Sequence, residues 1–330
     1  MGKGGSVRSG RYRIAAGLLH LSGVKLRFLV AVALLALLPV SPAAGDTLVH
    51  ADPTAENVSA YGGVQMWSRR DAAGRHRLVQ RVGAVVSDAP VAPARQAFDP
   101  DLGPGGKGVV AVYERCRKGF RRCDVYRLDI ATGRERRARG ASGRRGNEFG
   151  ASVWRGRYAF GREAQLREGL FTATRGHARF LAERDVLETD VRGNTIAFAT
   201  YSPSERVQVD ITGIFVHIVR ARGRGRSCLV ERGSQGGDEG TALNSPVLDG
   251  DHVYWHDFTA NPGIVERVAR APVSYACSRR PQIEFMSRPL PVGVDSIGVD
   301  RGTVYYTQGD FVDAAGVYVA DSPPPSFAGG

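Results

Sequence analysis

Residues 249–258, DGDHVYWHDF, decide how the rest of the chain is interpreted. The stretch has a turn glycine, Gly250, followed by an alternating strand that ends in the aromatic residue Trp255. Five other stretches have the same order of features: YGGVQMWS (61–68), GGKGVVAVY (105–113), WRGRYAFG (154–161), VRGNTIAFAT (191–200) and DRGTVYYTQ (300–308). We therefore interpret the opening stretch as one strand of a repeated fold.

The repeat has a period near 48 residues. The aromatic residues that end the six strands are separated by 46, 47, 38, 57 and 51 positions, and they are Trp67, Tyr113, Phe160, Phe198, Trp255 and Tyr306. A polar loop and a second apolar strand follow each of them, and another strand is visible in most units. Four short strands in a unit of about 40–50 residues are typical of a β-propeller blade. A β-sandwich is the alternative, but six matching units fit a ring better.

The two ends of the repeat region predict how the ring closes. The sixth unit ends after its third strand, GVYVAD (316–321), and passes into a Pro- and Gly-rich tail (322–330) that we expect to be disordered. The short apolar run TLVHA (47–51) can supply the missing outer strand and remove an exposed sheet edge. The sequence thus predicts an all-β, six-bladed β-propeller of four-stranded antiparallel blades over residues 46–321, whose N-terminal strand closes the last blade.

A small polar residue opens the first strand of every unit. These residues are Ser59, Asp101, Ser152, Asp190, Ser245 and Ser296. If their side chains point inward, Asp101 and Asp190, together with Asp295, make a channel-mouth site for a cation, a sugar or a peptide terminus. The alternative, which we favour, is that they bond backbone amides at the strand starts, as Ser and Asp commonly do.

The histidines of the opening stretch are a second candidate site. His252 and His256 are four residues apart on a strand and face the same side, whereas Asp257 faces the other. A metal site needs three or four convergent ligands, so we expect no metal and no cofactor here. We expect a blade strand with Trp255 packed between sheets, and we retain His256 as a candidate ligand-binding residue at the channel mouth.

Four cysteines follow the N-terminal segment. Cys116 and Cys123 flank a six-residue hairpin loop, RKGFRR, and cross-strand positions of this kind lie near disulfide distance. We predict a disulfide between them. Cys228 and Cys277 remain as a pair by elimination, but equivalent points on neighbouring blades can be far apart, so the sequence leaves their pairing open. None of the four has the spacing of a zinc site.

Residues 1–45 have the three parts of a signal peptide. Lys25 and Arg27 are basic, residues 28–38 form an apolar run that is short for a membrane span, and small residues favour cleavage after Ala43 or Gly45. We expect an exported protein, secreted or at the cell surface or periplasm, with no transmembrane segment in the mature chain. The stretch before Val24 makes the basic region unusually long, and we hypothesise that Val24 is the true start.

The segment 98–113, FDPDLGPGGKGVVAVY, resembles the Pro-Asp-Gly-Lys turn and strand of TolB-type propellers. Pro104, Gly106 and Lys107 match the turn, whereas Gly105 replaces the usual Asp and Leu102-Gly103 replaces the usual aromatic-Ser pair. The resemblance is good over one blade and diffuse over the other five. It implies a propeller fold and no activity, since members of that family mostly bind partners.

Charge and motifs narrow the function classes. The chain has a formal charge of +12, of which residues 1–45 contribute six basic side chains and no acid. Arg-rich stretches at 117–122, 134–145 and 220–226 could bind an anionic cell-wall polymer or phosphate, but we favour solvated loops and no nucleic-acid partner. The sequence has no G-x-S-x-G, P-loop or H-E-x-x-H motif.

We therefore expect an exported, bacterial, monomeric scaffold that binds a protein or an envelope polymer, and we expect a binding module rather than an enzyme. The alternative is an extracellular polysaccharide-active hydrolase or lyase. Asp101, Asp190 and His256 would then be the residues at the channel mouth that carry the chemistry.

Overall fold

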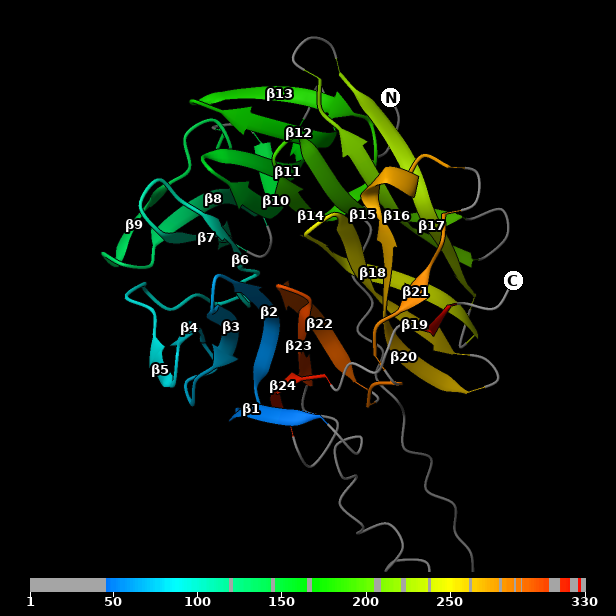
Figure 1. The fold of residues 1–330 in the computed structure, drawn as a ribbon. Coiled ribbons are helices and arrows are strands. Elements are labelled where there is room, and N and C mark those ends of the chain that lie inside the picture. Colours follow the sequence, from blue (N-terminus) through cyan, green and yellow to red (C-terminus); the bar gives the residue numbers. More distant parts are fainter. Residues whose placement is uncertain are drawn as a thin grey trace, which may run out of the picture. The chain divides into compact units, whose positions relative to one another are not determined.

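The computed structural model contains six blades of antiparallel strands around a central channel (Figure 1). It describes residues 46–118, 121–143, 146–164, 168–204, 209–220, 224–236, 239–260, 263–278, 281–287, 289–291, 293–308, 315–320 and 326–327. The predicted signal peptide, with its cleavage site and the proposed start at Val24, lies outside the described residues. The six-bladed fold confirms the β-propeller predicted from the six sequence repeats.

Each blade is numbered from its innermost strand outward. Blade 1 consists of β2 (Ala55–Tyr61), β3 (Val64–Arg70), β4 (His76–Val82) and β5 (Val85–Asp88); blade 2 of β6 (Asp101–Pro104), β7 (Val109–Lys118), β8 (Arg121–Asp129) and β9 (Arg134–Arg137); blade 3 of β10 (Gly146–Trp154), β11 (Arg157–Ala164), β12 (Gly169–Thr174) and β13 (His177–Ala182). Blade 4 consists of β14 (Val186–Arg192), β15 (Thr195–Ser204), β16 (Val209–Ile218) and β17 (Arg226–Gly236); blade 5 of β18 (Glu239–Asp249), β19 (His252–Ala260), β20 (Ile264–Pro272) and β21 (Glu284–Phe285), with a 3₁₀ turn at Val273–Tyr275; blade 6 of β22 (Val294–Asp300), β23 (Thr303–Gln308) and β24 (Gly316–Val319).

The N-terminal strand closes the ring, as predicted. β1 (Thr47–Ala51) pairs antiparallel with β24 and becomes the fourth strand of blade 6, with Leu48 opposite Tyr318. The Tyr306 hydroxyl donates a hydrogen bond to Asp46 at 2.6 Å, which holds the beginning of β1 against the same blade. Blades 1 and 6 lie side by side at this closure, with β1 beside β24 in Figure 1.

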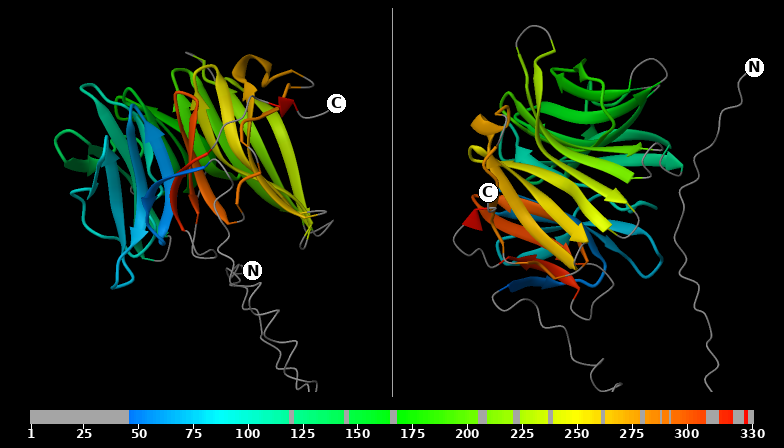
Figure 2. Two further views of the ribbon diagram at one scale, coloured as in Figure 1. Left: turned by 60° about the horizontal axis from the view of Figure 1, so that its bottom comes forward. Right: turned by 90° about the vertical axis from the view of Figure 1, so that its right-hand side faces the viewer.

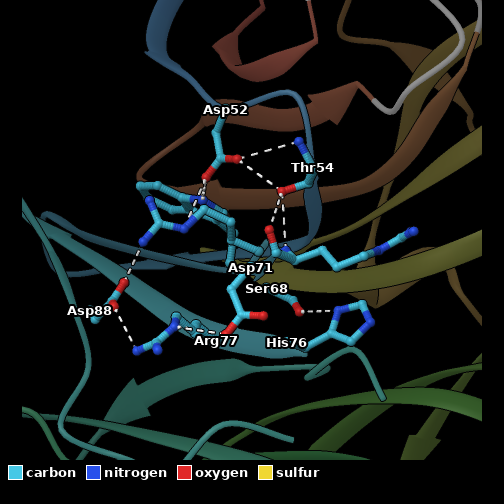
Figure 3. Close-up of polar contacts among 10 residues, drawn as sticks. Asp52, Thr54, Ser68, Asp71, His76, Arg77 and Asp88 are labelled. Carbon is cyan, nitrogen blue, oxygen red and sulfur yellow. Dashed lines mark hydrogen bonds and ion pairs between the residues drawn. The ribbon is translucent and has the colours of Figure 1, made fainter. Parts of the chain in front are cut away.

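Asp52 anchors the chain where it passes from blade 6 to blade 1. Its carboxylate is 3 % exposed and accepts hydrogen bonds from the Trp67 indole N–H (2.9 Å) and the Thr54 N–H (3.3 Å). Figure 3 shows the contact between Asp52 and Thr54. A buried carboxylate is stabilised only when its oxygens have such partners. Asp52 thus fixes the crossover at the closure of the ring.

The core consists of aromatic and aliphatic side chains packed between neighbouring blades. The six strand-ending aromatic residues predicted from the repeat are all fully buried: Trp67, Tyr113, Phe160, Phe198, Trp255 and Tyr306. They lie on the second strand of their blades, and both faces of that strand are covered by adjacent sheets. Burying a side chain of this size contributes roughly 1.5–3 kcal/mol, so the repeat marks the main stabilising contacts of the ring.

Glycines shape the turns between first and second strands. Gly62 and Gly63 join β2 to β3 with φ of +61° and +81°, and Tyr61 pairs directly with Val64. Two residues with positive φ make the tight hairpin turn whose twist matches the strands, and glycine adopts this backbone at no steric cost. The turn glycines of the repeat are therefore a geometric requirement.

Both disulfides form. Cys116 and Cys123 are directly opposite on β7 and β8, which confirms the predicted pair. Cys228 on β17 of blade 4 is joined to Cys277, which follows β20 in blade 5, so the pairing left open by the sequence exists and links two blades. Entropic cross-link arguments give about 2–3 kcal/mol for a loop of the first size and about 4 kcal/mol for one of the second.

Blades 4 and 5 are also joined by main-chain pairing between β17 and β18, and their long strands stand out in green and yellow in Figure 2. Of the tail predicted to be disordered, the structure describes only β25 (Ser326–Phe327), which pairs with β21 in blade 5. The prediction for the rest of the tail lies outside the described residues. Within the described part of the chain, no helix is long and apolar enough to cross a membrane.

Candidate functional site

A small cavity lies in the central channel, toward the end at which the inner strands begin. Its volume is about 50 Å³, and all six blades contribute to its wall. The polar residues of that wall include Asn57, Ser59, Asp99, Asp101, Glu188, Thr189, Ser245 and Ser296. We call this site the acidic cavity, because its charged lining residues are carboxylates.

The polar ring predicted from the sequence joins neighbouring blades, from blade 6 through blade 1 to blade 5. Four of its six members accept a hydrogen bond from a backbone N–H of the following blade: Ser296 from Val58 (2.6 Å), Ser59 from Leu102 (3.0 Å), Asp101 from Val153 (2.8 Å) and Asp190 from Leu248 (2.5 Å). The favoured alternative, in which these side chains bond backbone amides, is thus confirmed for these four residues. The sequence did not indicate that the amides belong to the neighbouring blade.

The other two members contact the ring differently. Ser152 Oγ lies 2.8 Å from Thr189 Oγ1, which donates to the carbonyl oxygen of Gly150 (2.6 Å). Ser245 has a positive φ of 49°, and its backbone N–H donates to Glu188 Oε2 at 2.6 Å. Side-chain-to-backbone bonds of this kind therefore join blade 3 to blade 4 and blade 4 to blade 5.

Three further carboxylates at this end were missed by the sequence reasoning. Glu188 bonds Ser245 as described, Glu114 Oε1 accepts from the Ala151 N–H (2.7 Å), and Asp99 has no hydrogen-bond partner among the described residues. A signal for two of them exists: Asp99 and Glu188 stand two positions before Asp101 and Asp190. Residues two apart in extended chain point to the same side, so the pattern could have placed them at the channel.

Burial dominates the electrostatics of these groups. It raises the pKa of Asp99 to about 6, of Asp190 to about 6 and of Glu188 to about 7. Burial also raises the pKa of Asp101 and of Glu114, and the neighbouring charges of Asp190 and Asp99 add to the respective shifts. Among the residues described, no Lys, Arg or His lines the cavity. The wall carboxylates Asp99, Asp101 and Glu188 are therefore held close together without a basic side chain among them.

The structure separates the candidate residues predicted from sequence. Asp101 lies on the cavity wall, and Asp190 is close enough for its charge to raise the pKa of Asp101. Asp295 is exposed and is not part of the wall. His256 was placed at the channel mouth, but it is 2 % exposed inside blade 5.

His256 belongs to an inter-blade contact instead. Its ring nitrogens lie 2.9 Å from Asn244 Oδ1 and 3.1 Å from Glu266 Oε2. Glu266 also accepts the N–H groups of Gly293 (2.7 Å) and Val294 (3.0 Å) at the start of blade 6. The placement at the mouth was wrong because second-strand residues in a blade pack between sheets, and Trp255 beside it is fully buried as expected.

The opposite end of the channel has a different construction. Tyr61 at the end of β2 and Trp154 at the end of β10 meet with ring centroids 5.8 Å apart, although their blades are not neighbours. Arg192 lies over the Trp154 ring at 5.0 Å and pairs with Asp249 at 3.0 Å. Asp249 also accepts the Gly302 N–H (2.7 Å). We call this the aromatic end, because aromatic rings and paired charges contact one another there.

A serine and a histidine meet in blade 1 but do not form a catalytic pair. Ser68 Oγ lies 3.4 Å from His76 Nδ1 (Figure 3). Ser68 is fully buried and accepts the Phe98 N–H at 3.1 Å, so it connects blade 1 to the chain that enters blade 2. Nearby, Arg77 pairs with Asp71 and Asp88, both at 3.2 Å. A nucleophile needs access to substrate, which a fully buried hydroxyl lacks.

Acidic residues can also bind metal ions, if several potential ligands lie close together. Over the described ranges of the chain, no group of three or more His, Cys, Asp or Glu side chains is arranged to hold a metal ion. The acidic cavity offers hydrogen-bond acceptors and negative charge to a ligand.

Comparisons with known proteins place the fold. No protein-family model matches the sequence, and no curated protein matches it either. Among solved structures, a puromycin-hydrolyzing peptidase from Mycobacterium tuberculosis is 13 % identical with a TM-score of 0.52, covering 85 % of this chain and 53 % of that chain. A puromycin hydrolase is 14 % identical with a TM-score of 0.51, covering 83 % of this chain and 54 % of that chain.

TolB from Acinetobacter baumannii is also matched, at 9 % identity and a TM-score of 0.40, covering 70 % of this chain and 56 % of that chain. This chain thus spans little more than half of each of these three chains. Identities this low concern the fold alone. The chain is a six-bladed β-propeller, as the resemblance implied, and residues 105–108 join β6 to β7.

Proposed function

We propose that this protein is an exported recognition scaffold whose acidic cavity takes the cationic tip of a partner. The observation that carries the proposal is the charge imbalance of the cavity: carboxylates from blades 2 and 4 converge there, and no basic side chain of the described wall balances them. The surrounding chain is net basic, so the negative charge is local to this site.

The size of the cavity indicates the ligand class. A volume of about 50 Å³ suits a few water molecules or the end of one side chain. A lysine ammonium, an arginine guanidinium or a chain N-terminus is small and positive, and it donates hydrogen bonds that carboxylate oxygens accept. The inter-blade bonds of Asp101 and Glu188 fix both carboxyl groups before a ligand arrives, which lowers the entropy lost on binding.

The two disulfides support export. Cys116–Cys123 and Cys228–Cys277 account for every cysteine, and disulfides persist in oxidising compartments rather than in the cytosol. A secreted, surface or periplasmic location agrees with the signal-peptide pattern of residues 1–45. The partner is then a protein or an envelope polymer that carries amino groups.

The test is a binding assay with five-residue peptides whose central residue is Lys, Arg, acetyl-lysine or Gln. We expect Lys or Arg peptides to bind and the neutral peptides to fail. Asp99→Asn and Glu188→Gln should each weaken binding about tenfold, as loss of a charge-assisted bond does. Glu183→Gln, which removes an exposed acid outside the cavity, is the matched control. Equal binding of neutral and cationic peptides would contradict the proposal.

An enzyme acting on polysaccharide is the second candidate, and one observation favours it. The pKa of Glu188, about 7, lets this side chain donate a proton near neutral pH, as the general acid of such an enzyme must. Asp99 or Asp190 would supply the second carboxylate. Release of reducing ends or unsaturated sugars from soluble polysaccharides, abolished by Glu188→Gln, would establish this function; inactivity across neutral and acidic polymers would leave the scaffold.

A further inference from the structure

A second cavity of about 410 Å³ lies between blades 3 and 4, away from the acidic cavity. We call it the basic cleft, and its lining includes Arg157, Thr172, His177, Arg179, Asn194 and Arg220. Among the described residues, no Asp or Glu lines it. Only Arg220 belongs to an Arg-rich stretch noted in the sequence, so the cleft is assembled by the fold.

Strand register explains why these side chains gather. Arg157 on β11 pairs with Thr174 on β12, Thr174 pairs with His177 on β13, and Thr172 pairs with Arg179. Residues directly opposite one another, or two apart on one strand, point to the same face of a sheet. These side chains therefore share one face of blade 3.

That face looks toward blade 4. Ala159, Leu170 and Leu181 are two positions further along the same strands, and they pack in one buried cluster with Ile196 and Phe198 of blade 4. The apolar part of the face is thus sealed by the neighbouring blade. Where the apolar side chains end, the same face continues as arginine, threonine and histidine and opens into the cleft.

The fold holds Arg157 in place without neutralising its charge. Arg157 Nη1 donates to the Gly193 carbonyl (2.8 Å) and to Asn194 Oδ1 (2.9 Å) at the first turn of blade 4. Both acceptors are neutral, and within the described chain neither Nε nor Nη2 of Arg157 has a partner. Arg179 is positioned from the same side by a bond from Nη2 to the Arg220 carbonyl (3.0 Å).

The two arginines repel each other. Burial, and after it the charge of Arg179, lowers the pKa of Arg157. Burial also lowers the pKa of His217 behind the cleft, and the charge of Arg179 adds to that shift. An anion that enters between two positive groups in a partly desolvated space lowers their electrostatic free energy, so such a space favours anion binding.

We propose that the basic cleft is a binding site for a phosphate-type oxyanion, contacted by Arg157 and Arg179 with Thr174 and His177 at its rim. Guanidinium groups match the oxygens of phosphate in bidentate geometry. A second arginine-lined cavity, around Arg122 and Arg137, differs because Asp124 on its wall already pairs with Arg137. This site is independent of the acidic cavity, so either can fail without the other.

The test is calorimetric titration of the purified protein with inorganic phosphate, at constant ionic strength and with chloride as the reference anion. We expect saturable binding, a Kd about tenfold higher for Arg157→Gln and for Arg179→Gln, and no change for Arg134→Gln. Arg134 is an exposed arginine on β9 without an ion pair in the described structure, so its substitution changes the net charge equally. Circular dichroism melts confirm that each variant is folded.

Two organic probes then distinguish the sources of the phosphate. Glycerol 3-phosphate presents a monoester, as a metabolite or a terminal phosphate does, and dimethyl phosphate presents a diester, as an internal unit of a polymer does. Saturable binding of either, lost with Arg157→Gln, supports the proposal and names the source. Linear, non-saturating heats, or equal weakening by Arg134→Gln, would show general ionic attraction and would overturn it.

Discussion

At both ends of the channel, carboxylates accept hydrogen bonds from backbone amides of the next blade, but the two ends differ in how the carboxylate charge is balanced. At the acidic cavity, Asp101 and Glu188 accept hydrogen bonds from backbone amides of the next blade, and no basic side chain of the described wall balances their charges. At the aromatic end, Asp249 also bonds a backbone amide of the next blade, but Arg192 pairs with it and Trp154 covers the arginine.

This difference distinguishes contacts that only stabilise the ring from contacts that can also bind a ligand. Both ends hold neighbouring blades together, so both stabilise the ring. Of the two ends, only the acidic cavity stores electrostatic repulsion that a ligand can relieve, because Asp99, Asp101 and Glu188 have no cationic partner in the described structure. A propeller can therefore stabilise one end of its channel with paired charge and leave the other end ready to bind.

The largest effect should follow from opening the aromatic end. Trp154→Ala removes the contact with Tyr61 and the cation–π contact with Arg192, and we expect the free energy of unfolding to fall by about 3 kcal/mol. Urea denaturation measures this loss. Trp154→Phe keeps a ring at the site and should recover at least half of it. A loss of less than about 1 kcal/mol for the alanine variant would mean that this end does not stabilise the ring.

The next largest effect should be a loss of stability with rising pH, caused by the buried carboxyl groups at and beside the acidic cavity. Carboxyl groups whose pKa is raised in the folded state bind more protons there than in the unfolded chain. Their contribution to stability is fully present below the unfolded values near 4 and is lost as pH rises through about 6 for Asp99 and Asp190 and about 7 for Glu188. We expect the protein to be about 2 kcal/mol less stable at pH 8 than at pH 5.

The control for this pH effect is Asp99→Asn, which removes one repelling charge without changing the size of the side chain. We expect it to raise stability at pH 8 and to flatten the pH dependence, with little change at pH 5. Urea midpoints at the two pH values give the answer. A wild-type protein that gains stability from pH 5 to pH 8 would contradict the electrostatic difference between the two ends.

The smallest effect should come from a single neutral inter-blade bond. Ser296→Ala leaves the buried Val58 N–H without its acceptor, and we expect a loss of about 1 kcal/mol that does not depend on pH. Ser87→Ala on the exposed outer strand of blade 1 should change stability by no more than a few tenths of a kcal/mol. Thermal melts at matched pH compare the two variants.

Sequence periodicity predicted the parts of the fold that depend on local order. The turn glycines and the alternating strands follow from contacts within one blade, the buried aromatic residues recur once in every blade, and closure by residues 47–51 follows from a missing strand. The hairpin disulfide was predictable for the same reason, because Cys116 and Cys123 are close in the chain. The bond between Cys228 and Cys277 was not, because it depends on how two blades pack.

The candidate sites could be predicted from the sequence even less completely than the fold, because they are formed by several blades. The sequence by itself placed Asp101 and Asp190 on inner strands, and Asp99 and Glu188 stand two positions before them. Only the tertiary structure decided which of these groups share a cavity, that His256 is buried in blade 5, and that Arg157 and Arg179 face blade 4. The physical reason is that charge, burial and pKa depend on distances between blades, which positions along the chain do not specify.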